Sequence, residues 1–219
     1  LRKTLDEGTK KVITLAKTTH PAGVLFVSSG AVYGLHRSDR KSLKEDVAPQ
    51  LKPHEHYGKY KKNAEELFET FHRLTKSPVT VARLFAFSGT NLHPESAFAI
   101  VDFLRKALKG EDIVIEGNGS ATRSYMDERD LAEWLLFLLL QNQSYDVVNV
   151  GSDRPVSISE LADEILRSFP AMKKIILNRP GVPDNFYVPD ITRAKKKYGL
   201  TSKYSLQESI KRMIESLKT

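Results

Sequence analysis

The chain has 219 residues, 40% of them hydrophobic and 28% charged, so it can bury a sizeable core and is neither a disordered tail nor a membrane-spanning protein. It contains no cysteine, which excludes a disulfide framework, thiolate metal sites and a cysteine nucleophile. The net charge of +7 would suit a phosphorylated or polyanionic ligand, although a lysine-rich surface explains it more simply.

The sequence indicates neither a membrane nor a nucleic-acid partner. The longest apolar run, residues 131–140, contains Glu133 and is too short to cross a bilayer. Residues 1–17 alternate charged and apolar residues, unlike a signal peptide. No basic stretch carries interleaved aromatic residues, as a single-stranded nucleic-acid platform would. We therefore expect a cytoplasmic protein.

The first 85 residues alternate helical and strand patterns. Apolar residues at helical spacing in residues 1–17 predict a helix, and this pattern is present from the first residues of the sequence. The continuous apolar run 24–27 is typical of a strand buried on both faces, and hence of a parallel sheet. A polar loop over 35–56, a helix over 57–74 and a strand over 79–85 follow. The alternation predicts a parallel α/β sheet, in which ligands bind beyond the carboxyl ends of the strands.

The second half is less regular and predicts a mixture of helices and short strands. We expect helices over residues 98–108, 130–140, 157–169 and 205–217, and strands over 112–116, 123–126, 147–150 and 175–177. Ser157 with Glu160, and Ser205 with Glu208, have the spacing of helix caps. The lysine run 195–197 is expected on a short, solvated helix.

Tyr57 and Lys61 form the most informative pair of polar residues. Their four-residue spacing at the start of a helix places both side chains on one face. A free tyrosine has a pKa near ~10, so only about one in a thousand is ionised at neutral pH. A neighbouring ammonium lowers that pKa, and the tyrosine can then exchange a proton with a substrate hydroxyl. Taken alone the pair is weak evidence, because eight tyrosines in a lysine-rich chain yield about one such pair by chance.

Ser29 ends the strand that precedes this helix, where its hydroxyl could share a proton with Tyr57. The runs Val27-Ser28-Ser29-Gly30-Ala31-Val32-Tyr33-Gly34 and Tyr57-Gly58-Lys59-Tyr60-Lys61 closely resemble the extended short-chain dehydrogenase/reductase superfamily, in its nucleotide-sugar epimerase and dehydratase branch. Further blocks agree in the same order along the chain, at residues 81–85, 117–132, 148–158 and 179–191.

The resemblance implies a doubly wound, Rossmann-type parallel sheet with a smaller mixed α/β substrate-binding domain. Residues 1–85, completed by about 145–170, would form the NAD-binding domain, and 86–144 with 171–219 mainly the substrate-binding domain. No G-x-x-G-x-x-G or G-x-G-x-x-G run occurs in the sequence. The sheet would therefore lack its first strands, and we expect roughly 90–100 residues with the glycine turn to precede the chain.

The resemblance also assigns roles to the residues. Tyr57 would be the catalytic acid and base, and Ser29 would hydrogen-bond the reacting sugar hydroxyl. Lys61 would hold the nicotinamide ribose and lower the pKa of Tyr57. The cofactor would be NAD, with NADP as the alternative, and further contacts to it would come from Ser28, Tyr57 and Phe85. Substrate contacts would come from Ser29, Ala86, Arg123 and Arg179, the two arginines gripping the diphosphate of a nucleotide-diphosphate sugar.

Departures from the family pattern reduce the number of reactions that the resemblance implies. Gly30 and Ala31 stand where 4,6-dehydratases carry the acidic pair that eliminates water. Ala86 replaces an asparagine that in many relatives touches the substrate phosphate, and the acidic Asp127 and Glu128 suggest a substrate other than the common hexoses. We therefore expect an NAD-dependent nucleotide-sugar 4-epimerase that forms a homodimer.

Alternatives remain open at this point. A keto-sugar reductase or a dehydratase of the same family would use the same residues, and a non-catalytic member would bind only a nucleotide or a partner protein. His54 and His56 lie in a polar loop without further ligands, so no metal site is expected.

Overall fold

A central parallel sheet confirms the predicted fold class. The computed structural model describes residues 2–34, 41–182 and 184–217, so residues 35–40 of the predicted loop lie outside the described residues. Strands β1 (Val24–Ser29), β2 (Val79–Leu84) and β7 (Tyr145–Val150) pair in the order β1-β2-β7, all parallel. Their carboxyl ends therefore meet at one edge of the sheet.

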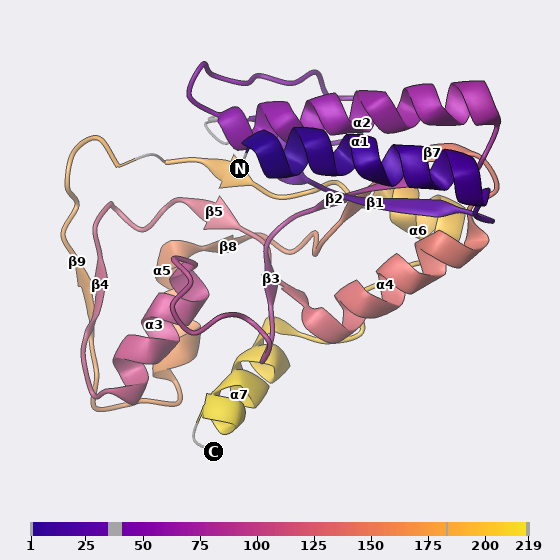
Figure 1. Ribbon diagram of the computed structural model, residues 1–219. Coiled ribbons are helices and arrows are strands. Elements are labelled where there is room, and N and C mark those ends of the chain that lie inside the picture. Colours follow the sequence, from indigo (N-terminus) through magenta and orange to yellow (C-terminus); the bar gives the residue numbers. More distant parts are fainter. Residues whose placement is uncertain (1, 35–40, 183, 218–219) are drawn as a thin grey trace.

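Helices cover both faces of this sheet (Figure 1). On one face lie α1 (Arg2–Thr19) and α2 (His56–Thr75), whose Ala16, Phe68 and Phe71 pack on alternate strand residues. On the other face lie α4 (Glu128–Gln141) and α6 (Thr192–Tyr198), which contribute Trp134, Leu138 and Ala194 to a second core. Successive strand side chains point to opposite faces, so Val81 belongs to the first core and Ala82 to the second.

The prediction that residues 24–27 are buried on both faces is wrong. Three of these residues are half-buried, and Val27 is 40% exposed. The physical reason is that β1 lies at an edge of the sheet, where β2 is its one strand neighbour among the described residues.

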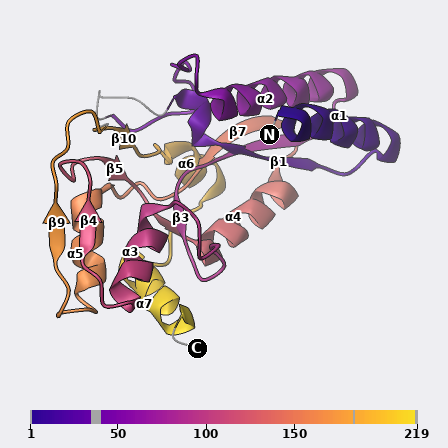
Figure 2. The ribbon, with the colours of Figure 1, turned by 60° about the vertical axis from the view of Figure 1, so that its left-hand side comes forward.

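A third core lies beside the sheet and is built from helices and short strands of the second half of the chain. Helices α3 (Ala99–Leu108), α5 (Ile158–Leu166) and α7 (Leu206–Leu217) pack together with β4 (Ile113–Ile115), which pairs with β9 (Lys174–Ile176) (Figure 2). Both predicted helix caps are confirmed: Ser157 and Glu160 form a capping box, and Ser205 and Glu208 exchange the corresponding bonds.

Several very short elements were not predicted. The expected strand over 123–126 is two strands, β5 (Thr122–Arg123) and β6 (Met126–Asp127). Four other elements have too few residues to show a repeat of apolar residues in the sequence. They are strands β3 (Phe87–Ser88), β8 (Val156–Ser157) and β10 (Phe186–Tyr187) and the 3-10 turn η1 (Gly30–Tyr33). β5 pairs with β8 and β10, and this register sets Tyr187 directly beside Arg123.

Within the described part of the chain, none of the helices is long and apolar enough to cross a membrane. The division into two domains stays a prediction.

Candidate active site

A cavity of about 660 Å³ lies at the carboxyl ends of β1 and β2. Its wall combines residues from the end of β1, the first turns of α2, the segment after β2, and β5. Every predicted site residue except Arg179 lines it, namely Ser28, Ser29, Tyr57, Lys61, Phe85, Ala86 and Arg123.

Tyr57 and Lys61 project from the start of α2 toward the edge of β1. The Lys61 Nζ donates a hydrogen bond to the Val27 carbonyl oxygen at 2.8 Å and lies 5.9 Å from the centroid of the Tyr57 ring. Burial lowers the pKa of Lys61, whereas Tyr57 is 42% exposed at the cavity wall. Gly58 permits this placement, because a Cβ there would lie 2.3 Å from the Ala31 carbonyl oxygen. The helix start therefore presents a phenol beside an ammonium.

Ser29 is fixed by two hydrogen bonds. Its Oγ accepts from the Ala31 backbone N–H at 3.1 Å, which caps η1, and its hydroxyl is hydrogen-bonded to that of Tyr187. Tyr187 is buried, its ring centroid lies 4.7 Å from that of Phe85, and burial raises its pKa well above the ordinary range. A Cβ on Gly30 would lie 2.4 Å from the Tyr187 hydroxyl oxygen. Sequence reasoning missed Tyr187, because β10 shows no strand pattern.

Arg123 enters the cavity wall from β5. Its Nη1 donates to the Asn185 Oδ1 at 2.6 Å and to the Thr122 carbonyl oxygen at 2.9 Å, and its guanidinium lies 5.6 Å from the Tyr187 ring centroid. Burial lowers the pKa of Arg123. Among the described residues it forms no ion pair with a carboxylate, so this half-buried cation can take an anion from a ligand.

The Ser28 hydroxyl is turned into the protein instead of toward a ligand. It donates to the Glu65 Oε1 at 2.6 Å, and Glu65 also accepts from the Arg83 Nε at 2.9 Å and Nη2 at 2.7 Å. Arg83 further donates to the Tyr33 hydroxyl, which donates to the Asn149 Oδ1. This buried network joins β1, α2, β2, η1 and β7 beneath the site.

Arg179 lies apart from the main cavity. It is exposed and forms an ion pair with Glu116, which lines an adjoining cavity of about 620 Å³. The two cavities share Ala97, Ala99 and Ile158 in their walls. The substrate contact of Arg179 therefore stays a prediction, located at the adjoining cavity.

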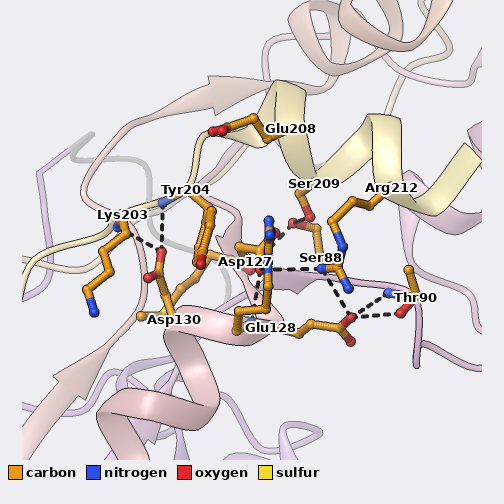
Figure 3. Close-up of polar contacts among 12 residues, drawn as sticks. Ser88, Thr90, Asp127, Glu128, Asp130, Lys203, Tyr204, Glu208, Ser209 and Arg212 are labelled. Atoms are coloured by element: carbon orange, nitrogen blue, oxygen red, sulfur yellow. Dashed lines mark hydrogen bonds and ion pairs between the residues drawn. The ribbon is translucent and has the colours of Figure 1, made fainter. Parts of the chain in front are cut away.

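The acidic residues Asp127 and Glu128 do not line either cavity. Asp127 caps α4 and pairs with Arg129. Glu128 accepts hydrogen bonds from Thr90 (Figure 3) and also from Asn91. The two acidic residues therefore hold α4 against its neighbouring segments, and their presence gives no information about the substrate.

In the described ranges, no group of three or more histidine, cysteine, aspartate or glutamate side chains could hold a metal ion.

Comparison with known proteins gives a consistent picture. The chain is 29% identical over 220 residues to UDP-glucuronic acid decarboxylase 6 of Arabidopsis thaliana, which covers 99% of this chain and 63% of the relative. Among solved structures it is similar to a UDP-glucose 4-epimerase of Thermotoga maritima with UDP-glucose (25% identity, TM-score 0.85, 99% of this chain and 70% of the other). A UDP-glucuronic acid 4-epimerase variant of Bacillus cereus, in complex with a fluorinated UDP-glucuronic acid and NAD, shares the fold (21% identity, TM-score 0.84, 99% and 68%).

The first curated relatives are longer than this chain, which spans 63% of their length. A family model described as the NAD dependent epimerase/dehydratase family matches residues 4–151, more than half of the chain. The resemblance inferred from the sequence motifs is therefore confirmed, and the chain belongs to the NAD dependent epimerase/dehydratase family.

Proposed function

We propose that this chain carries the proton-transfer and substrate-binding residues of an NAD-dependent nucleotide-sugar epimerase that acts at C4 of the sugar. The observation that supports this most is that one cavity gathers Ser29, Tyr57 and Lys61 with Arg123, a cation that has no carboxylate partner among the described residues. A binding module would need a pocket but not a phenol, an ammonium and a fixed serine hydroxyl together.

The residues fit the nicotinamide end of NAD. Lys61 places a half-buried ammonium at the carboxyl end of β1, where the dinucleotide of such sheets lies, and would donate to the ribose hydroxyls. When bound there, NAD would supply the reversible hydride transfer to and from the sugar carbon. The sequence contains no glycine-rich turn for the pyrophosphate.

Each residue has a distinct task in this scheme. The Tyr57 side chain takes the proton of the sugar hydroxyl as phenolate and later gives it back as phenol, with the Lys61 Nζ 5.9 Å from the centroid of its ring. Ser29 presents an oriented hydroxyl to the same sugar oxygen. Arg123 binds the diphosphate, a task for which a guanidinium fork is well shaped. The nucleotide would extend into the adjoining cavity beside Arg179.

The dehydratase alternative lacks an acid. Gly30 and Ala31 are neutral, and no described residue in the wall of the main cavity is an aspartate or a glutamate. We therefore expect no 4-keto-6-deoxy sugar to accumulate from dTDP- or GDP-hexoses. Mass spectrometric detection of that product in excess over enzyme would overturn this preference. A keto-sugar reductase would use the same residues and would differ by net consumption of NADH.

We also propose that the protein forms a homodimer through α1 and α2. These helices leave Val12 and Leu15 on α1, and Leu67 and Leu74 on α2, exposed to solvent. Large apolar side chains gathered on neighbouring helices commonly mark an interface between copies.

The variant Tyr57→Phe tests the catalytic proposal. It removes only the phenolic oxygen, and loss of acid–base help should lower kcat by about 10²–10⁴. The assay is interconversion of UDP-galactose and UDP-glucose by the protein at its natural length, with NAD present. The matched control is Tyr60→Phe, three residues along α2 and outside the cavity wall, which should change kcat little. Turnover of Tyr57→Phe within a few fold of the parent would contradict the assignment.

A further inference from the structure

Asn185 is a buried amide that contacts a cation of the main cavity. It lies immediately before β10 and is 8% exposed. Its backbone carbonyl oxygen accepts a hydrogen bond from the Thr122 N–H at 2.8 Å, where β10 pairs with β5. This strand pairing therefore sets the place of Asn185 beside Arg123, a residue 62 positions away in the sequence.

The amide holds one end of the Arg123 guanidinium. Its Oδ1 accepts a hydrogen bond from the Arg123 Nη1 at 2.6 Å, and the same nitrogen donates to the backbone carbonyl oxygens of Thr122 at 2.9 Å and Asn185 at 3.4 Å. Nη1 carries two N–H groups, so these three acceptors saturate it. The Tyr187 ring, whose centroid lies 5.6 Å from the guanidinium carbon, further limits where the group can move.

The other edge of the guanidinium is left for a ligand. Among the described residues, neither the Nε nor the Nη2 of Arg123 donates a hydrogen bond, and the side chain lines the main cavity. These two nitrogens present a pair of N–H groups that matches two oxygens of a phosphate. The acceptors at Nη1 are neutral carbonyl oxygens, so they orient the guanidinium without cancelling its charge.

We propose that Asn185 is a positioning residue for anion binding, which aims the Nε and Nη2 edge of Arg123 into the cavity and leaves its positive charge available. The inference rests on the proposed function, because it takes the anion to be the diphosphate of a nucleotide sugar. The neutrality of the amide is central to this role. An aspartate at position 185 would accept the same hydrogen bond, but its charge would pair with Arg123 and compete with the diphosphate.

Two variants at this position separate orientation from charge. Asn185→Asp keeps the size and the acceptor but adds a carboxylate beside Arg123, whereas Asn185→Leu keeps a similar volume and loses the acceptor. We expect the Kd for UDP to rise at least about tenfold in Asn185→Asp and only about threefold in Asn185→Leu. Calorimetric titration with UDP, using the protein at its natural length with NAD present, measures both.

Thermal unfolding without UDP gives a readout that distinguishes this role from a purely structural one. The new ion pair with Arg123 should keep the Tm of Asn185→Asp at or above that of the parent. Asn185→Leu loses one hydrogen bond of the guanidinium and should lower the Tm by about 2 °C. The two variants should therefore rank in opposite orders for stability and for UDP affinity. If Asn185 were only a structural contact, the less stable variant would also bind UDP less tightly.

Two further variants serve as controls. Gln143→Glu makes the same change from amide to carboxylate at an exposed position just before β7, at the opposite end of the sheet from the cavity, and should alter neither the Kd nor the Tm. Arg123→Gln removes the cation itself and should weaken UDP binding at least as much as Asn185→Asp does.

The outcomes distinguish the inference from the function on which it rests. If the parent protein does not bind UDP at millimolar concentration, the proposed function is overturned and the inference with it. If Arg123→Gln weakens UDP binding but Asn185→Asp binds UDP as tightly as Asn185→Leu or more tightly, the inference is overturned while the nucleotide-sugar function stands. The inference also fails if Asn185→Asp is the less stable of the two variants, since its loss of affinity would then follow from a damaged fold. Weaker UDP binding by an Asn185→Asp protein of undiminished Tm supports it.

Discussion

Ser29 owes its fixed hydroxyl to Tyr187, a residue more than 150 positions away in the sequence. The Ser29 Oγ accepts from the Ala31 N–H and is hydrogen-bonded to the Tyr187 hydroxyl, which is held in place by Phe85 and by Arg123 over its ring. In the proposed mechanism, Tyr187 would therefore position the Ser29 hydroxyl that is expected to meet the sugar.

Removing this hydroxyl should slow catalysis without weakening binding. In Tyr187→Phe the ring stays packed, but one hydrogen bond worth about 1 kcal/mol is lost, so kcat should fall roughly fivefold to tenfold while KM changes little. Steady-state kinetics of Tyr187→Phe, Ser29→Ala and the double variant check this. The double variant should be no slower than Ser29→Ala, because the effect of Tyr187 passes through Ser29. A further drop of the same size in the double variant would contradict the positioning role.

At the scale of elements, α1 and α2 form the face proposed as the dimer interface. Leu67 and Leu74 stand two turns apart on one side of α2, and Leu74 is 68% exposed. Substituting both by glutamate places like charges across a two-fold interface, so the protein should sediment as a monomer at micromolar concentration. Leu136→Glu, on the exposed side of α4, is the matched control. A dimer that persists in the double variant would show that another surface joins the copies.

The contact between β7 and α6 depends on the buried carboxylate of Asp146. It accepts hydrogen bonds from Lys197 Nζ at 2.7 Å, Tyr198 Oη at 2.6 Å and Arg193 Nη1 at 3.0 Å. Burial alone would raise the pKa of Asp146, but the hydrogen bonds of Lys197 and Tyr198 and the nearby positive charges hold it below the ordinary value.

This carboxylate should contribute to stability only where it is ionised. Because its pKa is lower in the folded chain than in the unfolded one, the contribution is complete above about pH 5 and is lost as the pH falls through the ordinary value near ~3.9 and then the folded-state pKa. Asp146→Asn should therefore lower the free energy of unfolding at pH 7 by about 1–3 kcal/mol, with a smaller difference at pH 3. Urea titrations at both pH values measure this; an equal difference at both would refute the charge argument.

How much of these elements the sequence predicts depends on their length. Helices such as α2 and α5 span several turns, so their apolar spacing and the cap at Ser157 identify them. Strand β10 has two residues, and its pairing with β5 depends on contacts between distant segments. Ser29, Tyr57 and Lys61 could therefore be predicted, whereas the bond to Tyr187 and the network under Ser28 required the folded chain.

At the scale of the whole molecule, these 219 residues offer more of the proposed binding site for the sugar nucleotide than for NAD. The two cavities proposed for the sugar nucleotide are formed by described residues, whereas no glycine-rich turn for a dinucleotide pyrophosphate occurs in the sequence.

The 219-residue chain on its own should therefore bind NAD weakly. The pyrophosphate normally receives backbone N–H groups and a helix N-terminus at that turn, and without them the proposed contacts of Lys61 and Tyr57 would be the main ones. We expect a Kd for NAD above about 100 μM by calorimetry, against a tighter Kd for UDP-glucose. Micromolar binding of NAD to this chain would show that its cofactor site does not depend on such a turn.

The close approach of Gly30 to Tyr187 also constrains how this site could evolve. Any side chain at position 30 starts with a Cβ that would lie 2.4 Å from the Tyr187 hydroxyl oxygen and 2.9 Å from the Phe85 ring. An acidic residue there, as the dehydratase chemistry requires, needs a smaller residue at position 187 or a shift of the packed Tyr187 and Phe85 side chains. The two substitutions are epistatic, and a mutational path that changes residue 30 first passes through a destabilised protein. Laboratory evolution toward dehydration should then fix the change at residue 187 before the acid.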